Sequence, residues 1–364
     1  MSIVFILIFV LYLLTILALN YGYTRIKVFK PQALIPKNKF SIIVPFRNEA
    51  GNLPQLLDSF SQLNYAKDSF EVVLVDDASS DGFELSDYEF KVVVLNNRRT
   101  SNSPKKDAIV TAMEHVAYDW VITTDADCVV HKNWLVTLDA FIQQKQPEMV
   151  AGPVAYTHGH SFLDHFQQLD LASLQGATIG SFGLGKGFMC NGANLVYTKS
   201  LFMSLNGFKG NDGIASGDDV FLLQKAMAKY PEKVAYLKSE SAIVTTQPVK
   251  DWKSLFYQRV RWASKTTRYQ SGFGKILGLI VFSGNLCWIL GFGFWVLGYW
   301  ILEYQLLLTV LKFVVDGILI VMTNRFLKKP TRFLILSSLL YPVFSVVVAL
   351  YSIFGKYEWK GRRF

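Results

Sequence analysis

Apolar runs at the two ends of this 364-residue chain constrain its fold more than any other feature of the sequence. Residues 2–19 carry no charged side chain and are just long enough to cross a bilayer as a helix, which takes about 20 residues. Three further apolar stretches, residues 276–301, 306–322 and 333–354, lie toward the other end. These runs predict transmembrane helices at both ends, with the charged part of the chain between them.

Basic residues beside the first run predict the orientation of the chain. Arg25, Lys27 and Lys30 follow it, and positively charged flanks stay preferentially in the cytoplasm. A cleaved signal peptide is the alternative for this run, but it lacks a basic leading region and a clear small-residue cleavage site. The formal charge of +9 indicates basic residues that orient the chain in a membrane rather than residues that bind nucleic acid. The polar region holds no Arg/Lys tract interleaved with aromatic residues. We expect an integral protein of the cell inner membrane with its polar domain in the cytoplasm.

The C-terminal apolar runs do not decide on which side of the membrane the C-terminus lies. The basic loop at residues 324–332 should be cytoplasmic, yet three full crossings would place the equally basic tail, residues 357–364, outside. The middle run carries Lys312 and Asp316, so it is the first candidate for a segment that does not cross fully.

Between the apolar ends, short strand-like runs alternate with a helical pattern. The expected strands are residues 40–45, 70–75, 91–95 and 120–123, and the expected helices are residues 53–63 and 108–116. This alternation predicts a parallel sheet covered on both faces, whose ligands bind beyond the carboxyl ends of the strands. The acidic residues that follow these strands are Glu49, Asp76, Asp77, Asp125 and Asp127.

Two acidic clusters at strand ends have a functional and a structural interpretation. Asp125 and Asp127 supply hard oxygen ligands that suit Mg²⁺ or Mn²⁺ bridging to a diphosphate, although the pair could also be a solvated turn. Asp76 and Asp77 precede a Ser-rich turn and could hold a ribose or a base by hydrogen bonds, or simply form the turn.

Three later segments have two interpretations each. Asp218 and Asp219 stand before a helical pattern, either as a helix N-cap or with one carboxylate as general base for an acceptor hydroxyl. The Gly-rich residues 182–194 are either a backbone-lined binding loop or a flexible connector. Residues 251–272 mix aromatic and basic side chains, which is typical of an interfacial helix, and could add Arg261 as a charge partner for pyrophosphate and Trp262 as a platform for sugars.

Taken in order, these segments resemble glycosyltransferase family 2, which has the GT-A fold. The resemblance covers residues 40 to about 269 and lies in residues 44–49, 75–82, 105–108, 125–127 and 217–219. The sequence Gln258-Arg259-Val260-Arg261-Trp262 is similar to the Gln-x-x-Arg-Trp signature of the membrane-bound branch. That branch includes cellulose, chitin and hyaluronan synthases and ceramide glucosyltransferases.

The resemblance implies a role for individual residues. It implies a metal site at Asp127 and Asp125, and a catalytic pair, Asp218 and Asp219, of which Asp219 is the base. The residues implied in donor binding are Pro45, Glu49, Asp76, Asp77, Lys106, Asp125, Gln258, Arg261 and Trp262. It also implies a divalent cation, Mg²⁺ or Mn²⁺, a UDP-linked donor by default, and inversion at the anomeric carbon.

These expectations combine into one organisation. An N-terminal anchor spans residues 1–22, a cytoplasmic GT-A glycosyltransferase domain residues 38–250, and an interfacial segment residues 251–272. A transmembrane region at residues 273–356 and a basic tail at 357–364 complete the chain. The expected function is an inverting, membrane-bound glycosyltransferase (EC 2.4.-.-) acting on a lipid or lipid-linked acceptor. The alternatives are a subunit of a processive polysaccharide synthase and an inactive, membrane-tethered nucleotide-binding subunit.

Overall fold

The structure, a computed structural model, describes residues 2–32, 34–157, 159–214, 216–355, 358–359 and 362–363. The chain divides into two compact units. One is mainly helical and comprises Met1–Ile26, His158–Gly187 and Pro248–Phe364. The other is an α/β unit and comprises Lys27–Thr157 and Phe188–Gln247. Residues 158–187, which lie inside the range 38–250, belong to the helical unit.

The α/β unit is built on a mixed, mostly parallel sheet. Within the described residues this sheet has seven strands in the order β3-β2-β1-β4-β8-β6-β9. Its strands are β1 (Phe40–Phe46), β2 (Phe70–Asp76), β3 (Lys91–Asn96), β4 (Trp120–Thr123), β6 (Met149–Ala151), β8 (Leu195–Thr198) and β9 (Val234–Tyr236). The first four run parallel, as expected, whereas β8 is antiparallel to both of its neighbours. The predicted parallel α/β sheet is thus confirmed for its first half.

Smaller sheets and helices complete the two units. A second sheet has the order β5 (Cys128–Val129), β10 (Val244–Thr246) and β7 (Val154–Tyr156). In the tail that we predicted as basic, β11 (Glu358–Trp359) pairs with β12 (Arg362–Arg363). The helices of the α/β unit are α2 (Leu53–Ser61), α3 (Pro104–Met113), α4 (Trp134–Lys145), α6 (Lys199–Ser204) and α7 (Asp218–Lys229).

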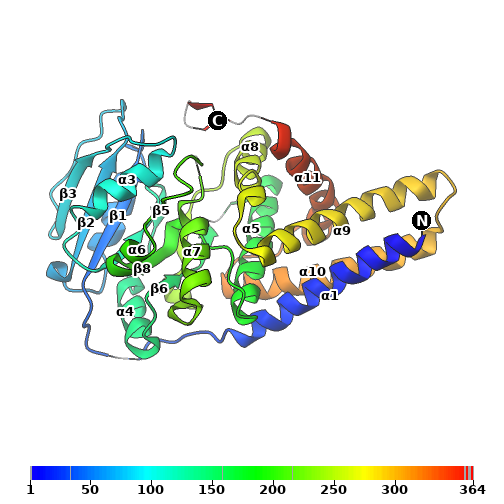
Figure 1. The fold of residues 1–364 in the computed structure, drawn as a ribbon, viewed down its shortest axis with the longest axis horizontal. Helices are drawn as coiled ribbons and strands as arrows, with labels where there is room; N and C mark the ends of the chain where they lie inside the picture. Colours follow the sequence, from blue (N-terminus) through cyan, green and yellow to red (C-terminus); the bar gives the residue numbers. More distant parts are fainter. Residues whose placement is uncertain are drawn as a thin grey trace. The chain divides into compact units, whose positions relative to one another are not determined.

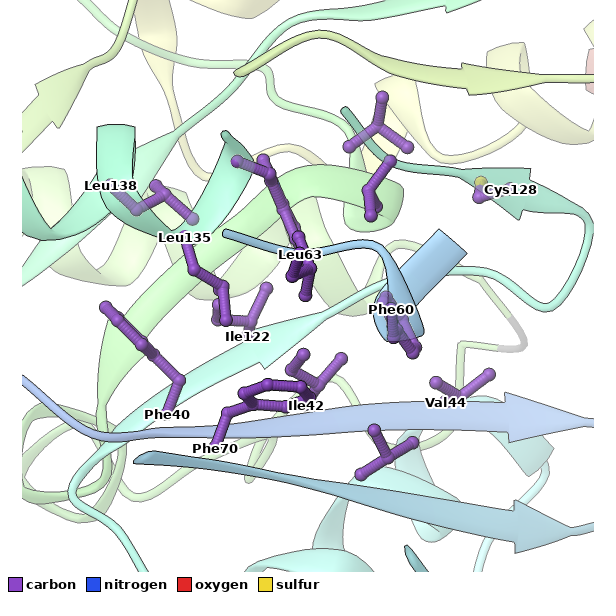
Figure 2. Close-up of a cluster of buried hydrophobic side chains, with 14 of the residues drawn as sticks. Phe40, Ile42, Val44, Phe60, Leu63, Phe70, Ile122, Cys128, Leu135 and Leu138 are labelled. Carbon is purple, nitrogen blue, oxygen red and sulfur yellow. The ribbon is translucent and has the colours of Figure 1, made fainter. Parts of the chain in front are cut away.

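The central strands are buried on both faces, which explains their nearly continuous apolar sequences. Ile42 and Val44 of β1 lie on the face shown in Figure 2, together with Phe60 of α2 and with Leu135 and Leu138 of α4. The alternate residues of these strands point to the opposite face, where α3 packs against β1 and β2. Two layers of helices thereby hold the sheet and leave its carboxyl edge for polar side chains.

The start of α3 differs from the sequence prediction in a way that matters for the site. We expected a helix from residue 108, but α3 begins at Pro104. Proline is favoured at the first helical position because its missing N–H has no partner there in any case. As a result Lys105, Lys106 and Asp107 lie in the first turn of a helix and have defined directions.

The helical unit contains α1 (Ser2–Arg25), α5 (Phe162–Gly183), α8 (Trp252–Ala263), α9 (Gly272–Val296), α10 (Leu302–Phe326) and α11 (Leu334–Phe354). In the part of the chain that the structure describes, four helices are long and apolar enough to cross a membrane: α1, α9, α10 and α11. In Figure 1, α1 (blue) runs along α10 (orange) and α9 (yellow), which agrees with the contacts between these helices. One N-terminal and three C-terminal helices match the apolar runs of the sequence.

The charges in the middle run do not interrupt α10. Lys312 is 2% exposed and forms an ion pair with Asp316 one turn further on. The hydroxyl of Tyr12 in α1 donates to Asp316 at 2.7 Å and accepts from the Lys312 ammonium at 2.9 Å. Because both charges have partners inside the helical unit, they do not set α10 apart from the other candidate spans.

Close contact between α1 and α5 depends on glycine. A methyl group on Gly180 would lie 2.5 Å from the carbonyl oxygen of Leu19, and one on Gly22 would overlap the carbonyl of Gly180. Small residues let two helix backbones approach each other where a side chain would keep them apart. Helix α5 therefore packs directly on the N-terminal helix, a feature that the sequence analysis missed.

We predict that Gly180→Ala destabilises the purified protein in detergent by about 1–3 kcal/mol, because the added methyl cannot fit against Leu19. The measurement is the thermal midpoint of unfolding. Gly293→Ala is the matched control, since it lies inside α9 with no heavy atom within 4 Å of the new methyl. Alanine there should be neutral or stabilising by up to about 1 kcal/mol. Equal midpoints for the two variants would contradict the close crossing.

Candidate functional site

The ends of β1 and β2 carry two loops that are bonded to each other. The guanidinium of Arg47 donates to the carbonyl oxygens of Asp77 at 2.6 Å and Ala78 at 2.7 Å. The amide of Asn48 donates to Ser79 Oγ at 2.9 Å. Because β1 and β2 are parallel neighbours, these bonds form a fixed rim at the carboxyl edge of the sheet.

The two aspartates of this rim have different surroundings. Asp77 is only 6% exposed and accepts hydrogen bonds from Asn97 at 2.8 Å and from Arg99 at 3.2 Å. Asp76 is half-buried, and its carboxylate accepts from the amide of Ser79 at 2.9 Å. Of the pair, Asp76 is the more exposed residue, whereas Asp77 holds the loop that follows β3.

Pro45 and Glu49 lie at the same edge. Pro45 is within β1 and half-buried, and Glu49 accepts from the side-chain amide of Asn52 at 2.6 Å, just before α2 begins. Both predicted donor-binding residues are thus placed beside Asp76 and Asp77, on adjacent strand ends.

Lys105 joins three predicted acidic residues into one cluster. Its ammonium lies 2.6 Å from Asp125 Oδ1 and 3.4 Å from Asp218 Oδ2. Asp219 accepts from the backbone amide of Gly192 at 2.9 Å. A methyl group on Gly192 would lie 3.1 Å from both Lys105 Nζ and Asp218 Oδ2, which places this glycine in the middle of the cluster. The structure therefore brings together residues that are far apart in the sequence.

Helix starts and a strand end explain this arrangement. Asp125 follows β4, Lys105 stands in the first turn of α3, and Asp218 and Asp219 are the first residues of α7. Carboxylates at a helix N-terminus are favoured by its unpaired amides, and Asp219 also accepts from Val220 at 2.7 Å. Part of the Gly-rich segment lies here as the turn Gly192–Asn194, which supports the binding-loop interpretation for that part.

The charges of the cluster control its protonation. Burial by itself would lower the pKa of Lys105, but the carboxylates of Asp125 and Asp218 outweigh burial and raise that pKa well above its ordinary value. Burial also raises the pKa of the neighbouring Tyr197, with Asp218 adding to the effect. Lys105 therefore stays positively charged at neutral pH.

A divalent cation fits this site only with help from a ligand. Asp125 and Asp127 are half-buried and lie one residue apart beyond β4. Among the described residues there is no group of three or more His, Cys, Asp or Glu side chains suited to a metal ion. Mg²⁺ and Mn²⁺ at nucleotide sites are held by one or two carboxylates together with phosphate oxygens and water. The carboxylates of Asp125 and Asp127 fit this shared mode of metal binding.

Lys106, which the resemblance implied in donor binding, has different contacts from Lys105. Its side chain is 1% exposed, and the ammonium donates to the carbonyl oxygens of Asn211 at 2.6 Å and Ile214 at 2.9 Å. It also lies over the ring of Phe221. A lysine used in this way holds the loop before α7, whereas its neighbour Lys105 contacts the acidic residues. The Pro104 helix start was the signal that both lysines have fixed directions, but it did not reveal which one faces the carboxylates.

The other predicted donor-binding residues belong to the helical unit. Gln258, Arg261 and Trp262 are half-buried on α8, whose first turn is capped by Asp251 accepting from Ser254 at 2.8 Å. Helix α8 (Trp252–Ala263) lies within the segment 251–272 that we expected to be interfacial. The role of Gln258, Arg261 and Trp262 in donor binding stays a prediction.

Comparison with known proteins bears on the α/β unit. Residues 41–205 match the model of the family described as Glycosyl transferase family 2. This region, rather than the whole chain, is therefore similar to family 2 glycosyltransferases. The match spans β1 to α6 and includes Asp76, Asp77, Lys105, Asp125 and Asp127, whereas α7 and α8 lie beyond it.

Known relatives share only part of their length with this chain. Glycosyltransferase AglE of Haloferax volcanii is 26% identical over 125 residues, which cover 32% of this chain and 40% of AglE. The undecaprenyl-phosphate 4-deoxy-4-formamido-L-arabinose transferase of Proteus mirabilis is 32% identical over 99 residues, which cover 25% of this chain and 29% of that enzyme. The chain thus spans less than half of either relative.

A solved structure is similar over nearly the whole chain. The mannosyltransferase PcManGT from Pyrobaculum calidifontis, in complex with GDP-Man and Mn²⁺, superimposes with a TM-score of 0.56 at 17% identity. The superposition covers 95% of this chain and 98% of that one. At this identity the likeness establishes the fold, a GT-A-like α/β unit accompanied by long apolar helices.

We predict that Lys105→Met lowers the free energy of unfolding by about 1–3 kcal/mol at neutral pH, because it leaves neighbouring carboxylates without their cation. Since the folded pKa of Lys105 is raised, its stabilisation is fully present below the ordinary lysine pKa and is lost only as pH rises through the raised value. The loss measured by denaturant unfolding should therefore be equal at pH 6 and pH 9. Lys132→Met, at an exposed position, is the control. A loss that vanishes by pH 9 would contradict the assignment.

Proposed function

We propose that this protein transfers a sugar from a nucleotide-sugar donor to a lipid or lipid-linked acceptor at a membrane. The observation that carries the proposal is the cluster of Lys105, Asp125, Asp218 and Asp219 in a family 2 glycosyltransferase domain. Four long apolar helices in the same chain support a membrane-bound acceptor. So does the relative from Proteus mirabilis, whose name specifies undecaprenyl phosphate.

In this proposal the donor diphosphate binds between the rim and the cluster. Asp125 and Asp127 would hold Mg²⁺ or Mn²⁺, which when bound neutralises the charge of the diphosphate. Lys105 adds a second positive charge close to Asp125. Asp76, Pro45 and Glu49 lie at the strand ends where a ribose and a base would bind. A nucleotide sugar is also what PcManGT holds, together with Mn²⁺.

The transfer step requires one group that accepts a proton. The acceptor hydroxyl oxygen forms a bond to the anomeric carbon, and the bond from that carbon to the diphosphate oxygen breaks with its electron pair leaving on the diphosphate. The hydroxyl proton passes to a carboxylate, for which we choose Asp219. Asp218 is 8% exposed and paired with Lys105, whereas Asp219 is half-buried and held in place by two backbone amides. Attack opposite to the leaving group inverts the anomeric centre.

The helical unit supplies the membrane part of the proposal. Arg25 is the last residue of α1, and Lys27 and Lys30 follow the helix. These charges favour an inner-membrane protein whose α/β unit is cytoplasmic. Gln258, Arg261 and Trp262 on α8 would bind the donor or the sugar, as the Gln-x-x-Arg-Trp signature implies.

The decisive test offers purified protein a panel of nucleotide sugars with extracted membrane lipids and measures nucleotide release and labelled lipid product. We expect one donor to give glycolipid in the wild type. Asp219→Asn should reduce transfer by about 10²–10⁴-fold, because the acceptor loses its base. Asp87→Asn, at an exposed position, should leave transfer unchanged. Full activity of Asp219→Asn would refute the assigned base, and long polymer instead of glycolipid would favour the processive synthase.

Metal dependence is a separate prediction. Removal of divalent cations with EDTA should abolish transfer, and Mn²⁺ or Mg²⁺ should restore it. Without a cation between them, the two carboxylates and the diphosphate are all anions and repel each other. Asp127→Asn should raise the Mn²⁺ concentration needed for half-maximal transfer. Transfer that persists in EDTA would contradict the metal role of Asp125 and Asp127.

A further inference from the structure

Arg259 is a buried charge in the segment of α8 that carries Gln258 and Trp262. Only 5% of Arg259 is exposed, whereas Gln258 and Trp262 are half-buried. A guanidinium stays protonated in proteins, and a buried charge is stable only when it is paired and hydrogen-bonded. The partners of Arg259 therefore show which groups this residue holds in place.

The guanidinium of Arg259 contacts side chains from two helices of the helical unit. Its Nε donates to Oδ2 of Asp170, which belongs to α5 and is likewise 5% exposed. Nη1 donates to Oε1 of Gln258. The carbon Cζ lies 4.2 Å from the centre of the Trp262 ring system. One planar cation thus joins a carboxylate, a carboxamide and an indole.

These contacts fix the chemistry that Gln258 and Trp262 offer to a ligand. Arginine can only donate hydrogen bonds, so it takes the carbonyl oxygen of the Gln258 carboxamide. The NH₂ group is then the end that can donate to a sugar or phosphate oxygen. The guanidinium covers one face of the Trp262 ring, and the opposite face is the one on which a sugar could stack.

Asp170 determines where the guanidinium lies. A charge-assisted bond between two buried groups is strong and directional, and removal of either partner leaves an unpaired charge. Asp170 stands in the middle of α5, whose backbone is in close contact with α1 through glycine. The position of Arg259 is therefore defined by a helix that is itself held by the N-terminal helix.

We propose that Arg259 and Asp170 are positioning residues for sugar transfer. Together they orient the Gln258 carboxamide as a hydrogen-bond donor and the Trp262 indole as a one-sided stacking surface. The inference rests on the proposed function, although the contacts that carry it lie within α5 and α8. It assigns a role to the second residue of the segment 258–262, for which the signature specifies no residue type. It assigns a second role to an aspartate 89 residues earlier in the chain.

The orientation of Trp262 can be measured directly. The full chain is produced with 5-fluorotryptophan, and the ¹⁹F resonance of Trp262 is identified by its absence in Trp262→Phe. Arg259→Lys and Asp170→Asn should shift or broaden this resonance and leave the other tryptophan resonances unchanged. Arg268→Lys, the same change at an exposed position, should alter none. An unchanged Trp262 resonance in Arg259→Lys overturns the inference. If Asp170→Asn fails to fold, Arg259→Lys, which keeps the charge, still decides.

Activity separates positioning from general structure. Arg259→Lys should lower kcat for transfer on the order of 100-fold, since misplacement of binding groups by about 1 Å has that effect. Gln258→Glu keeps an oxygen for Arg259, so it should leave the Trp262 resonance in place while transfer falls because the NH₂ donor is gone. Full transfer by Gln258→Glu or by Arg259→Lys contradicts the proposal. If the wild type transfers sugar from no donor, the proposed function fails, whereas the resonance shifts still test the positioning roles.

Discussion

Repulsion between carboxylates is the constraint on which the site depends. Asp125, Asp218 and Asp219 come from two distant segments, and their proximity would be unfavourable without the ammonium of Lys105. The lysine is supplied by a helix that starts at Pro104, on the parallel half of the sheet, whereas Asp218 and Asp219 stand at the start of α7. The Lys105 ammonium therefore links the end of β4, the start of α3 and the start of α7.

Sequence reasoning recovered the parallel strands because buried β-branched runs are visible without any tertiary information. It placed β1, β2, β3 and β4 within one or two residues of their ends, and it gathered the acidic residues at strand ends correctly. The geometry of parallel sheets makes these positions predictable, since successive carboxyl ends meet at one edge. The antiparallel strand β8 and the short strands beyond it were not predicted, because three- and four-residue segments carry too little pattern to be recognised.

The errors have physical causes that can be named. Lys106 was chosen over Lys105, yet one residue along a helix changes the direction of a side chain by about 100°. Helix α5 was missed because its polar residues, Gln167, Gln168 and Asp170 among them, are buried in the structure and hide the usual amphipathic pattern. Their partners lie on other helices, as with Asp170 and Arg259 or Gln168 and Asn324, so only the folded chain reveals why they are tolerated.

The ion pair inside α10 has a consequence for how the helical unit assembles. Lys312 and Asp316 lie one turn apart on the same helix, so they neutralise each other before any neighbouring helix is present. A helix that carries its own counter-charge can enter a bilayer at lower cost than one that exposes a single charge. The phenol of Tyr12 is the external partner, which becomes available once α1 lies alongside. Insertion and helix packing are therefore separate steps. The ion pair allows α10 to insert into the bilayer by itself, and the Tyr12 hydroxyl then stabilises one register of α1 against α10.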